Sequence, residues 1–472
     1  MGGSAFLTHN PPLPTPRMPL EIYQKILSQT LTLLQEHYSQ CASPIEGPGK
    51  KDFGDVDILV ASPKSPEYDA FPTSSQDAKK TEIQSPMRNV AQNLSVLLGA
   101  EAFIVEKGNP TINFAIPWPD SASPANTNLY LEQAQQNAEE EEHQTPIQEK
   151  KYIQIDIHHL PNPQYFHWEL FHSAHGDLWN ILGTIIRPFG LTANNIGLYI
   201  RIPEIELLDR KKSMILLTSE PGLVLDFLGL DEGRWWNEFG SQEEMFRFAM
   251  GCRMFWIKEE NEDGEGEGEV VGDVAVDGRG GKEGGEMSKK KLKHNDRQRM
   301  SKRPIFKAWI EEFVPKVREE GCAKVAKVTR EEIREEAMEK FGMREVYEQR
   351  VRDWKLERNG IELGAILKGA VPGADEVDPP LRAAAIRFLR SVIKDEEEFD
   401  GVIPEAAKLD KNGLYDLDRV RAFVESNWRR AGETGLKRQH DKSVENHRLK
   451  ESLKAKETGE VENDTQEVKL DT

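Results

Sequence analysis

The chain has 472 residues, long enough for roughly two to four domains, and 38% of its residues are apolar. Its net charge of −19 argues against a dedicated nucleic-acid binder, because such proteins are usually basic, although an average over the chain leaves room for a local basic face. It has no run of about 18 apolar residues and no secretory signal, so we expect no membrane association and a nuclear or cytoplasmic location. Its three cysteines lie far apart without paired spacing, as is usual in a reducing compartment.

The first quarter of the chain alternates between polar, helical and strand-like patterns. Residues 1–19 are rich in proline, and we expect them to be disordered. The following residues predict a helix over 20–40, a Gly-Lys loop over 47–51, a strand over 55–62, an insertion over 62–84, a helix over 85–99 and two strands over 101–117. Ser85 and Gly99 are of the residue types that begin and end helices.

The rest of the chain becomes increasingly charged. We expect, in order, an insertion over 119–148, a strand in "KYIQIDIHHLP" (residues 151–161), mixed helices and short strands, a helical extension over 206–258, a linker over 259–303, a helical domain over 304–430 and a disordered tail over 431–472. The linker joins a Gly- and Glu-rich part to a basic cluster, residues 289–303. A nuclear localisation signal, a nucleic-acid patch and a solvated linker are alternatives for that cluster.

Three aspartates in strand-like sequence are the candidates for chemistry. Asp55 and Asp57 are two residues apart in "GDVDILV", so in a strand their side chains project from the same face. Asp156 interrupts an apolar strand pattern, where an unpartnered carboxylate is costly to bury. Three converging carboxylates repel one another unless a cation lies among them, and Mg²⁺ prefers oxygen ligands of this kind. The alternative is a chance Asp-x-Asp at a solvated strand edge.

In the order of its elements the chain resembles the nucleotidyltransferase superfamily, and most closely the palm of family X DNA polymerases. The resemblance lies in "GDVDILV" and in residues 153–204, "IQIDIHHLPNPQYFHWELFHSAHGDLWNILGTIIRPFGLTANNIGLYIRIPE", and it covers about residues 25–205. It implies an α+β fold over 20–205, a mixed sheet with flanking helices, followed by the helical extension and the C-terminal helical domain. It also implies transfer of a nucleoside monophosphate from an NTP to a hydroxyl acceptor, which is a nucleic acid or another molecule.

The resemblance implies roles for individual residues. Asp55 and Asp57 would bind two Mg²⁺ or Mn²⁺ ions, and Asp156 would bind the ion that activates the attacking hydroxyl. The residues implied to contact the nucleotide are Gly47, Gly49 and Gly54 through their backbones, Lys50 and Lys51 as point charges on phosphate, and Asn180 at the base. Solvated loop lysines are the alternative for Lys50 and Lys51.

The sequence also departs from the family pattern. Pro48 stands where the family has Ser or Gly, and proline has no N–H to offer a phosphate. Gln154 and Thr184 replace residues that are basic in the DNA polymerases. The Gln154 and Thr184 replacements argue against template-directed DNA synthesis. The altered phosphate loop and the acidic balance of the chain favour an alternative function, a catalytically inactive protein of this fold that acts as a binding or scaffold module. A generic interaction protein without the fold would leave the three carboxylates apart.

Overall fold

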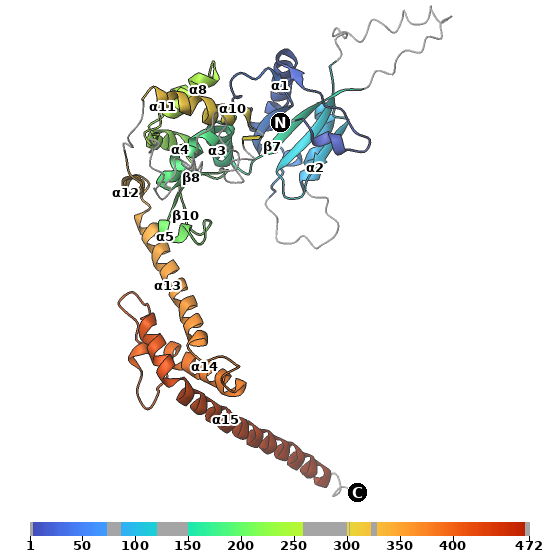
Figure 1. Ribbon diagram of the computed structural model, residues 1–472. Helices are drawn as coiled ribbons and strands as arrows, with labels where there is room; N and C mark the ends of the chain where they lie inside the picture. Colours follow the sequence, from blue (N-terminus) through green and yellow to red (C-terminus); the bar gives the residue numbers. More distant parts are fainter. Residues whose placement is uncertain are drawn as a thin grey trace, which may run out of the picture. The chain divides into compact units, whose positions relative to one another are not determined.

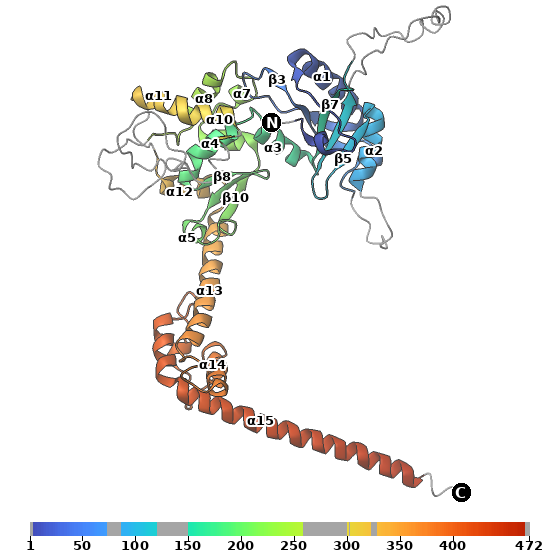
Figure 2. The same cartoon turned by 45° about the vertical axis from the view of Figure 1, so that its right-hand side comes forward.

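The protein is an α+β chain that forms two compact units, Met1–Met343 and Arg344–Thr472. The computed structural model describes residues 3–72, 86–119, 150–257, 300–301, 303–321 and 328–467, with side chains up to Leu453 (Figures 1 and 2). Most of the expected insertions over 62–84 and 119–148, and most of the linker over 259–303, therefore lie outside the described residues. Ser85, the expected helix start, lies outside them as well.

The first unit is built on a mixed sheet of five strands. They are β2 (Tyr38–Ala42), β4 (Asp55–Pro63), β5 (Ala102–Val105), β6 (Thr111–Pro117) and β7 (Tyr152–His159), in the spatial order β2-β4-β7-β6-β5. The central pair, β4 and β7, runs parallel, and the other neighbours are antiparallel. The strands predicted over 55–62, 101–117 and 151–161 are thus present, as is the expected mixed sheet with flanking helices.

One face of this sheet carries the core. The isoleucines of β7 and the alternate residues Val56, Ile58 and Val60 of β4 are fully buried or nearly so. They pack against apolar side chains of α1 (Leu20–His37) and α2 (Pro86–Leu98), which lie beside the sheet in Figures 1 and 2. Alternation in the strands therefore places every second side chain under these two helices and turns the others to the opposite face.

The opposite face is covered at its two ends. At one end Leu59 and Ala61 of β4 pack with Phe166 of α3 (Pro163–Ser173). At the other end Ala115 and Tyr152 pack with N-terminal apolar residues. Asp55, Asp57 and Asp156 lie on this face, between the two apolar patches.

Residues 3–19 are ordered, which corrects the disorder expected for this part of residues 1–19. A short 3₁₀ helix η1 (Ala5–Thr8) precedes β1 (Met18–Pro19), which pairs with β3 (Asp52–Phe53). Phe6 is fully buried, and Leu13 and Met18 are 8% and 1% exposed. These three apolar residues reach the sheet although the prolines around them prevent regular structure, so composition alone gave the wrong expectation.

The second half of the first unit combines a small sheet with short helices. Its elements are α4 (Leu178–Ile186), η3 (Arg187–Phe189), β8 (Leu191–Ala193), β9 (Leu198–Arg201), α5 (Pro203–Glu206), β10 (Met214–Thr218), α6 (Pro221–Leu228), α7 (Glu232–Trp235), α8 (Gln242–Met250), α10 (Pro304–Ala308), η4 (Trp309–Phe313), α11 (Val314–Glu319) and α12 (Arg330–Lys340); η2 (Pro66–Tyr68) follows β4. The three strands pair in the order β10-β9-β8. The expected boundary at 205–206 is therefore wrong, because it falls between two paired strands.

The helices α10 to α12 belong to the first unit, so the helical domain does not begin at residue 304. Trp309 and Phe313 of η4 pack on Phe246 of α8, with ring centroids 5.5 and 5.2 Å apart. Arg330 at the start of α12 forms an ion pair with Glu206 at 2.6 Å. The aromatic contacts between η4 and α8 therefore assign these helices to the first unit. The helical pattern of the sequence cannot predict such contacts between segments separated by a long linker.

The second unit is helical and extends through the expected tail. It contains α13 (Arg344–Gly369), α14 (Pro379–Lys394), η5 (Glu405–Ala407) and α15 (Leu417–Glu467). The helix α15 occupies most of residues 431–472, which corrects the expected disorder. Its glycines allow a close approach to α14, since a Cβ on Gly432 would lie 2.7 Å from Leu381 Cδ1 and one on Gly435 would lie 2.9 Å from the carbonyl oxygen of Ala384.

We predict that Gly435→Ala destabilises the second unit. Helix propensity favours alanine by about 1 kcal/mol, but the new methyl group would overlap the α14 backbone and cost about 1–3 kcal/mol. Gly364→Ala in α13 is the matched control, because nothing lies within 4 Å of its Cβ position. Amide hydrogen exchange of α14 in the full chain should become faster in Gly435→Ala and not in Gly364→Ala. Equal slowing in both variants would contradict the packing argument.

Candidate metal centre

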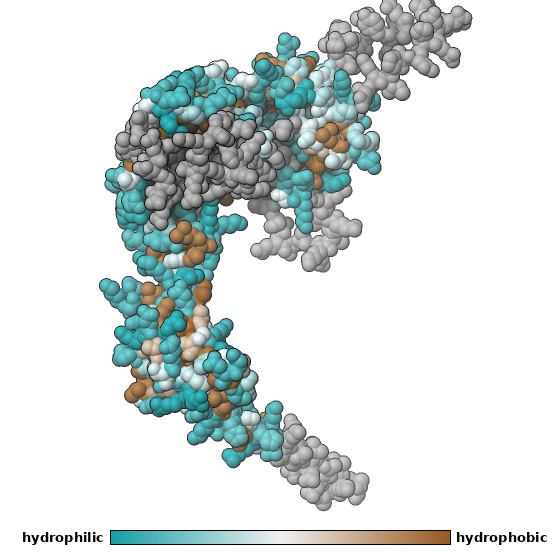
Figure 3. All heavy atoms as spheres, in the orientation of Figure 1, coloured by the Kyte–Doolittle hydropathy of each residue, from teal (hydrophilic) through white to brown (hydrophobic). Residues whose placement is uncertain are grey.

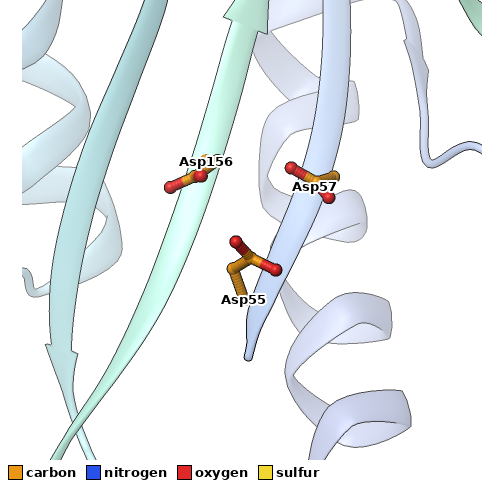
Figure 4. A group of neighbouring side chains, drawn as sticks. All are labelled: Asp55, Asp57 and Asp156. Carbon is orange, nitrogen blue, oxygen red and sulfur yellow. The ribbon is translucent and has the colours of Figure 1, made fainter. Parts of the chain in front are cut away.

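Three aspartates meet on the face of the sheet that points away from α1 and α2. The parallel register of β4 and β7 places Asp57 opposite Asp156 and Asp55 opposite Gln154. Each aspartate offers one carboxylate oxygen, and these oxygens all lie within 4.8 Å of one another. Figure 4 shows the three side chains on the same face of two neighbouring strands. The arrangement that a generic interaction protein would lack is therefore present.

Hydrogen-bond donors hold two of the three carboxylates. Asn113 of β6 donates to Asp156 Oδ1 at 2.7 Å, and the Gln154 amide donates to both Asp156 oxygens at 2.9 and 3.1 Å. The backbone N–H of Gly3 donates to Asp55 Oδ2 at 3.1 Å. Asp57 is the most solvent-exposed of the three, and no hydrogen bond from a described residue reaches its carboxylate. Asp57 thus keeps both oxygens available to a ligand.

The three carboxyl groups all have raised pKa values. The protein around Asp57 desolvates it, and together with the charges of Asp55 and Asp156 this raises its pKa to about 7. Desolvation raises the pKa of Asp156 to about 6 in spite of the hydrogen bonds from Asn113 and Gln154. Desolvation also raises the pKa of Asp55, against the opposing effect of the Gly3 hydrogen bond. A cation at this position would remove the cost of ionising all three groups together.

The donor set fits a hard divalent cation. It consists of carboxylate oxygens alone, without histidine or cysteine, and this favours Mg²⁺ or Mn²⁺ over softer metals. Hydrogen-bond donors hold Asp55 and Asp156 in place, while Asp57 stays open. Asp55, Asp57 and Asp156 are therefore the residues that could hold such an ion.

The loop before β4 lies beside the turn between α3 and α4. Gly47 is buried, and a Cβ on it would lie 3.5 Å from the carbonyl oxygen of His175. Pro48 and Gly49 form a turn in which Gly49 has a φ of +79°, a conformation that favours glycine. Gly54 is buried directly before Asp55, and its carbonyl oxygen faces Gly3. The predicted loop glycines thus shape the backbone near the site.

The two predicted loop lysines differ. Lys50 forms an ion pair with Glu46, whose other oxygen accepts a hydrogen bond from the Tyr23 hydroxyl at 2.9 Å. Lys51 is exposed. The charges of Glu46 and Lys50 both act on the pKa of Asp57, in opposite directions, which places this pair within electrostatic reach of the aspartates. Lys50 would have to leave Glu46 to contact a phosphate.

Asn180 lies in a different cluster. It is in the first turn of α4, and its side chain donates to Asp177 Oδ1 at 3.3 Å. Arg303, the last residue of the basic cluster, also bonds to this oxygen at 2.6 Å. Among the described contacts none joins Asn180 to the three aspartates.

Sequence reasoning missed three contributors to the site. Asn113 is the one polar side chain among the apolar residues of "INFAI", a signal of the same kind that drew attention to Asp156. Gln154 attracted notice only as a replacement for a basic residue, and its buried amide is a donor to Asp156. Gly3 lies in a segment expected to be disordered, so no sequence signal pointed to it.

Comparison of the chain with protein-family models and with curated proteins gave no match. Within the described residues, no helix combines the length and the apolar character needed to cross a lipid bilayer. The face of the molecule in Figure 3 is mostly hydrophilic, with apolar side chains in small separate groups. The case for function therefore rests on the three aspartates and their surroundings.

We predict that metal-free protein loses stability as the pH rises and that a divalent cation restores it. The pKa values of Asp57 and Asp156 are about 7 and 6 in the folded chain, above the value of about 4 in an unfolded chain. The folded state therefore binds more protons between about pH 4 and 7, so its unfolding free energy falls over that range.

Thermal unfolding in EDTA should occur several degrees lower at pH 8 than at pH 5, and Mn²⁺ should raise the melting temperature more at pH 8. In Asp57→Asn both differences should shrink, because the variant lacks the carboxyl group whose pKa is raised to about 7. An Mn²⁺ effect of equal size in Asp57→Asn would place the ion elsewhere.

Proposed function

We propose that this protein is a metal-dependent nucleotidyltransferase that transfers a nucleoside monophosphate from an NTP to a hydroxyl group of an acceptor. The observation that carries the proposal is the convergence of Asp55, Asp57 and Asp156 on the parallel strands β4 and β7. The sheet order, with a helix and a loop before β4 and a hairpin before β7, supports a nucleotidyltransferase-type palm over residues 20–205.

The chain's own residues have distinct tasks in this reaction. Asp55 and Asp57 would hold the divalent ions, and Asp156, kept in place by Asn113 and Gln154, would lie on the acceptor side. When bound, such ions neutralise the triphosphate and lower the pKa of an attacking hydroxyl. The acceptor hydroxyl would give up its proton to solvent, and its oxygen would form a bond to the α-phosphorus. The bond from that phosphorus to the oxygen bridging the α- and β-phosphates would break, and pyrophosphate would leave. Positioning and charge neutralisation supply most of the rate.

The loop lysines are the candidates for holding the triphosphate. Pro48 offers no N–H, so the backbone of the loop gives fewer donors than a Gly-Gly or Gly-Ser loop would. Lys50 carries a charge close to the aspartates but is paired with Glu46. Substrate binding would therefore exchange the Glu46 carboxylate for a phosphate as the partner of Lys50.

The second candidate function is a binding or scaffold module of the same fold. Two observations favour it, the Pro48–Gly49 turn and the engagement of Lys50 by Glu46. A module of this kind would bind an NTP or a polyanion without releasing pyrophosphate. Both candidate functions would use the same surface, so binding alone does not distinguish them. A measurement of nucleotide transfer does.

The deciding test is incorporation of label from [α-³²P]NTPs with Mg²⁺ or Mn²⁺ across RNA, DNA and protein acceptors. We expect label in at least one acceptor, and a loss of about a hundredfold or more in Asp57→Asn, since the charge that holds the ions is removed. Asp52→Asn is the matched control, because Asp52 is an exposed aspartate paired with Arg17 at 2.6 Å. Labelling no greater than that of Asp55→Ala/Asp57→Ala with every acceptor would overturn the enzymatic proposal and leave the binding module.

Glu46→Gln should lower the KM for the NTP. The variant frees Lys50 from an exposed ion pair worth about 1 kcal/mol, close to a fivefold change, and keeps the hydrogen-bond acceptor for Tyr23. The measurement is the steady-state KM and kcat of the variant with the best acceptor. Lys50→Gln should raise the KM in the same assay, whereas an unchanged KM in both variants would remove Lys50 from the triphosphate site.

A further inference from the structure

The described N-terminal residues reach two of the three site carboxylates. Gly3 donates its backbone N–H to Asp55 Oδ2 at 3.1 Å. Ala5 donates its backbone N–H to Gln154 Oε1 at 3.0 Å, and the amide of Gln154 in turn donates to both oxygens of Asp156. One short segment thus supports a carboxylate on β4 directly and a carboxylate on β7 through one intermediate side chain.

We propose that the segment of residues 3–15 is a positioning element of the metal centre, with Gly3 and Gln154 as its positioning residues. This inference rests on the proposed metal-binding function of the three aspartates. A carboxylate that binds a cation through one oxygen is oriented by donors to the other, and the loss of such a donor typically weakens metal binding about 10–100-fold.

The segment is fixed in place by contacts that are independent of the carboxylates. Phe6 is fully buried against Ala115 and Tyr152. The backbone N–H of Tyr152 donates to the Pro14 carbonyl at 2.9 Å, which ties the segment to the start of β7. The Thr15 hydroxyl donates to the Gly3 carbonyl at 2.5 Å, so the segment also closes on itself. Two backbone amides are therefore presented to the site from a rigid base.

Only glycine fits at the point of contact. Gly3 has a φ of +83°, and a Cβ on it would lie 2.2 Å from the carbonyl oxygen of Gly54, the residue that precedes Asp55. Any side chain at position 3 would push the segment away from β4 and break the hydrogen bond to Asp55. The close approach is thus a specific feature of this residue.

The N-terminal segment itself leaves Asp55 Oδ1 and both oxygens of Asp57 open, whereas Asn113 and Gln154 donate to the oxygens of Asp156. Among the described residues no hydrogen bond reaches Asp55 Oδ1 or either oxygen of Asp57. A segment that blocked the site would engage these oxygens, or fill the space in front of β4 and β7 beside the three side chains drawn in Figure 4. The pattern of contacts therefore fits support of the ligands better than competition with the ion.

The test is the Mn²⁺ affinity of the full chain, measured from the electron paramagnetic resonance signal of the free ion. Gly3→Ala displaces the segment, and Gly108→Ala is its matched control, because Gly108 has a φ of +80° with nothing within 4 Å of its Cβ position. Gln154→Met is a second variant that keeps the length of the side chain and loses its hydrogen bonds. Asp55→Asn/Asp57→Asn measures binding to the acidic linker, which is subtracted.

We expect Gly3→Ala and Gln154→Met each to weaken Mn²⁺ binding about tenfold or more, and Gly108→Ala to stay within about twofold of the natural chain. Amide exchange of Val56 and Ile155 reports that the sheet is intact in each variant. If Gly3→Ala and Gln154→Met bind Mn²⁺ as tightly as Gly108→Ala, or more tightly, the positioning role is wrong while the metal centre stands. If the natural chain binds no more Mn²⁺ than Asp55→Asn/Asp57→Asn, the metal centre and the proposed function are overturned with it.

Discussion

The parallel pairing of β4 with β7 determines both the core of the first unit and its candidate site. Val56 and Ile58 point under α1 and α2, and the same alternation turns Asp55 and Asp57 to the other face. A slip of one residue would bury the aspartates among apolar side chains and expose the isoleucines, so the register is strongly specified. Burial of the core therefore brings three carboxyl groups together on the other face. The residues around them have to compensate the repulsion between their charges.

The hydrogen bonds around the three aspartates offset only part of the repulsion between their charges. Asn113, Gln154 and Gly3 donate hydrogen bonds to Asp156 and Asp55, yet the pKa values of Asp57 and Asp156 remain near 7 and 6. Donors that are neutral dipoles reduce the repulsion but do not cancel it. The covering of the same face at both ends, by α3 and by the N-terminal residues, removes water that would otherwise screen the charges. A bound proton or a cation would relieve the repulsion that remains.

The positions of the strands with a periodic sequence pattern could be predicted from the sequence. Strict alternation located β4 and β7, and the two-residue spacing of Asp55 and Asp57 predicted a shared face. The sequence was insufficient where partners are distant. Asn113 becomes a neighbour of Asp156 only through the register of β6 on β7, and the irregular spacing of Phe6 and Leu13 among prolines gave no periodic signal. The packing of η4 on α8 could not be predicted either, because the two segments are far apart in the sequence and no local pattern indicates their contact.

The choice between catalysis and simple binding depends on what compensates the three carboxylates. A scaffold that used this face without a cation would be more stable with Asn in place of Asp57, because the amide has the same shape and no charge to repel Asp55 and Asp156. The Lys50–Glu46 pair does not solve the problem, since it is a neutral pair whose two charges act on Asp57 in opposite directions. An ion among the aspartates does solve it, and it leaves Asp57, the most open of the three, facing solvent where a triphosphate would approach. The electrostatics of the three carboxylates therefore favour our proposal that a cation binds here, and the open Asp57 is compatible with the proposed reaction on a phosphate.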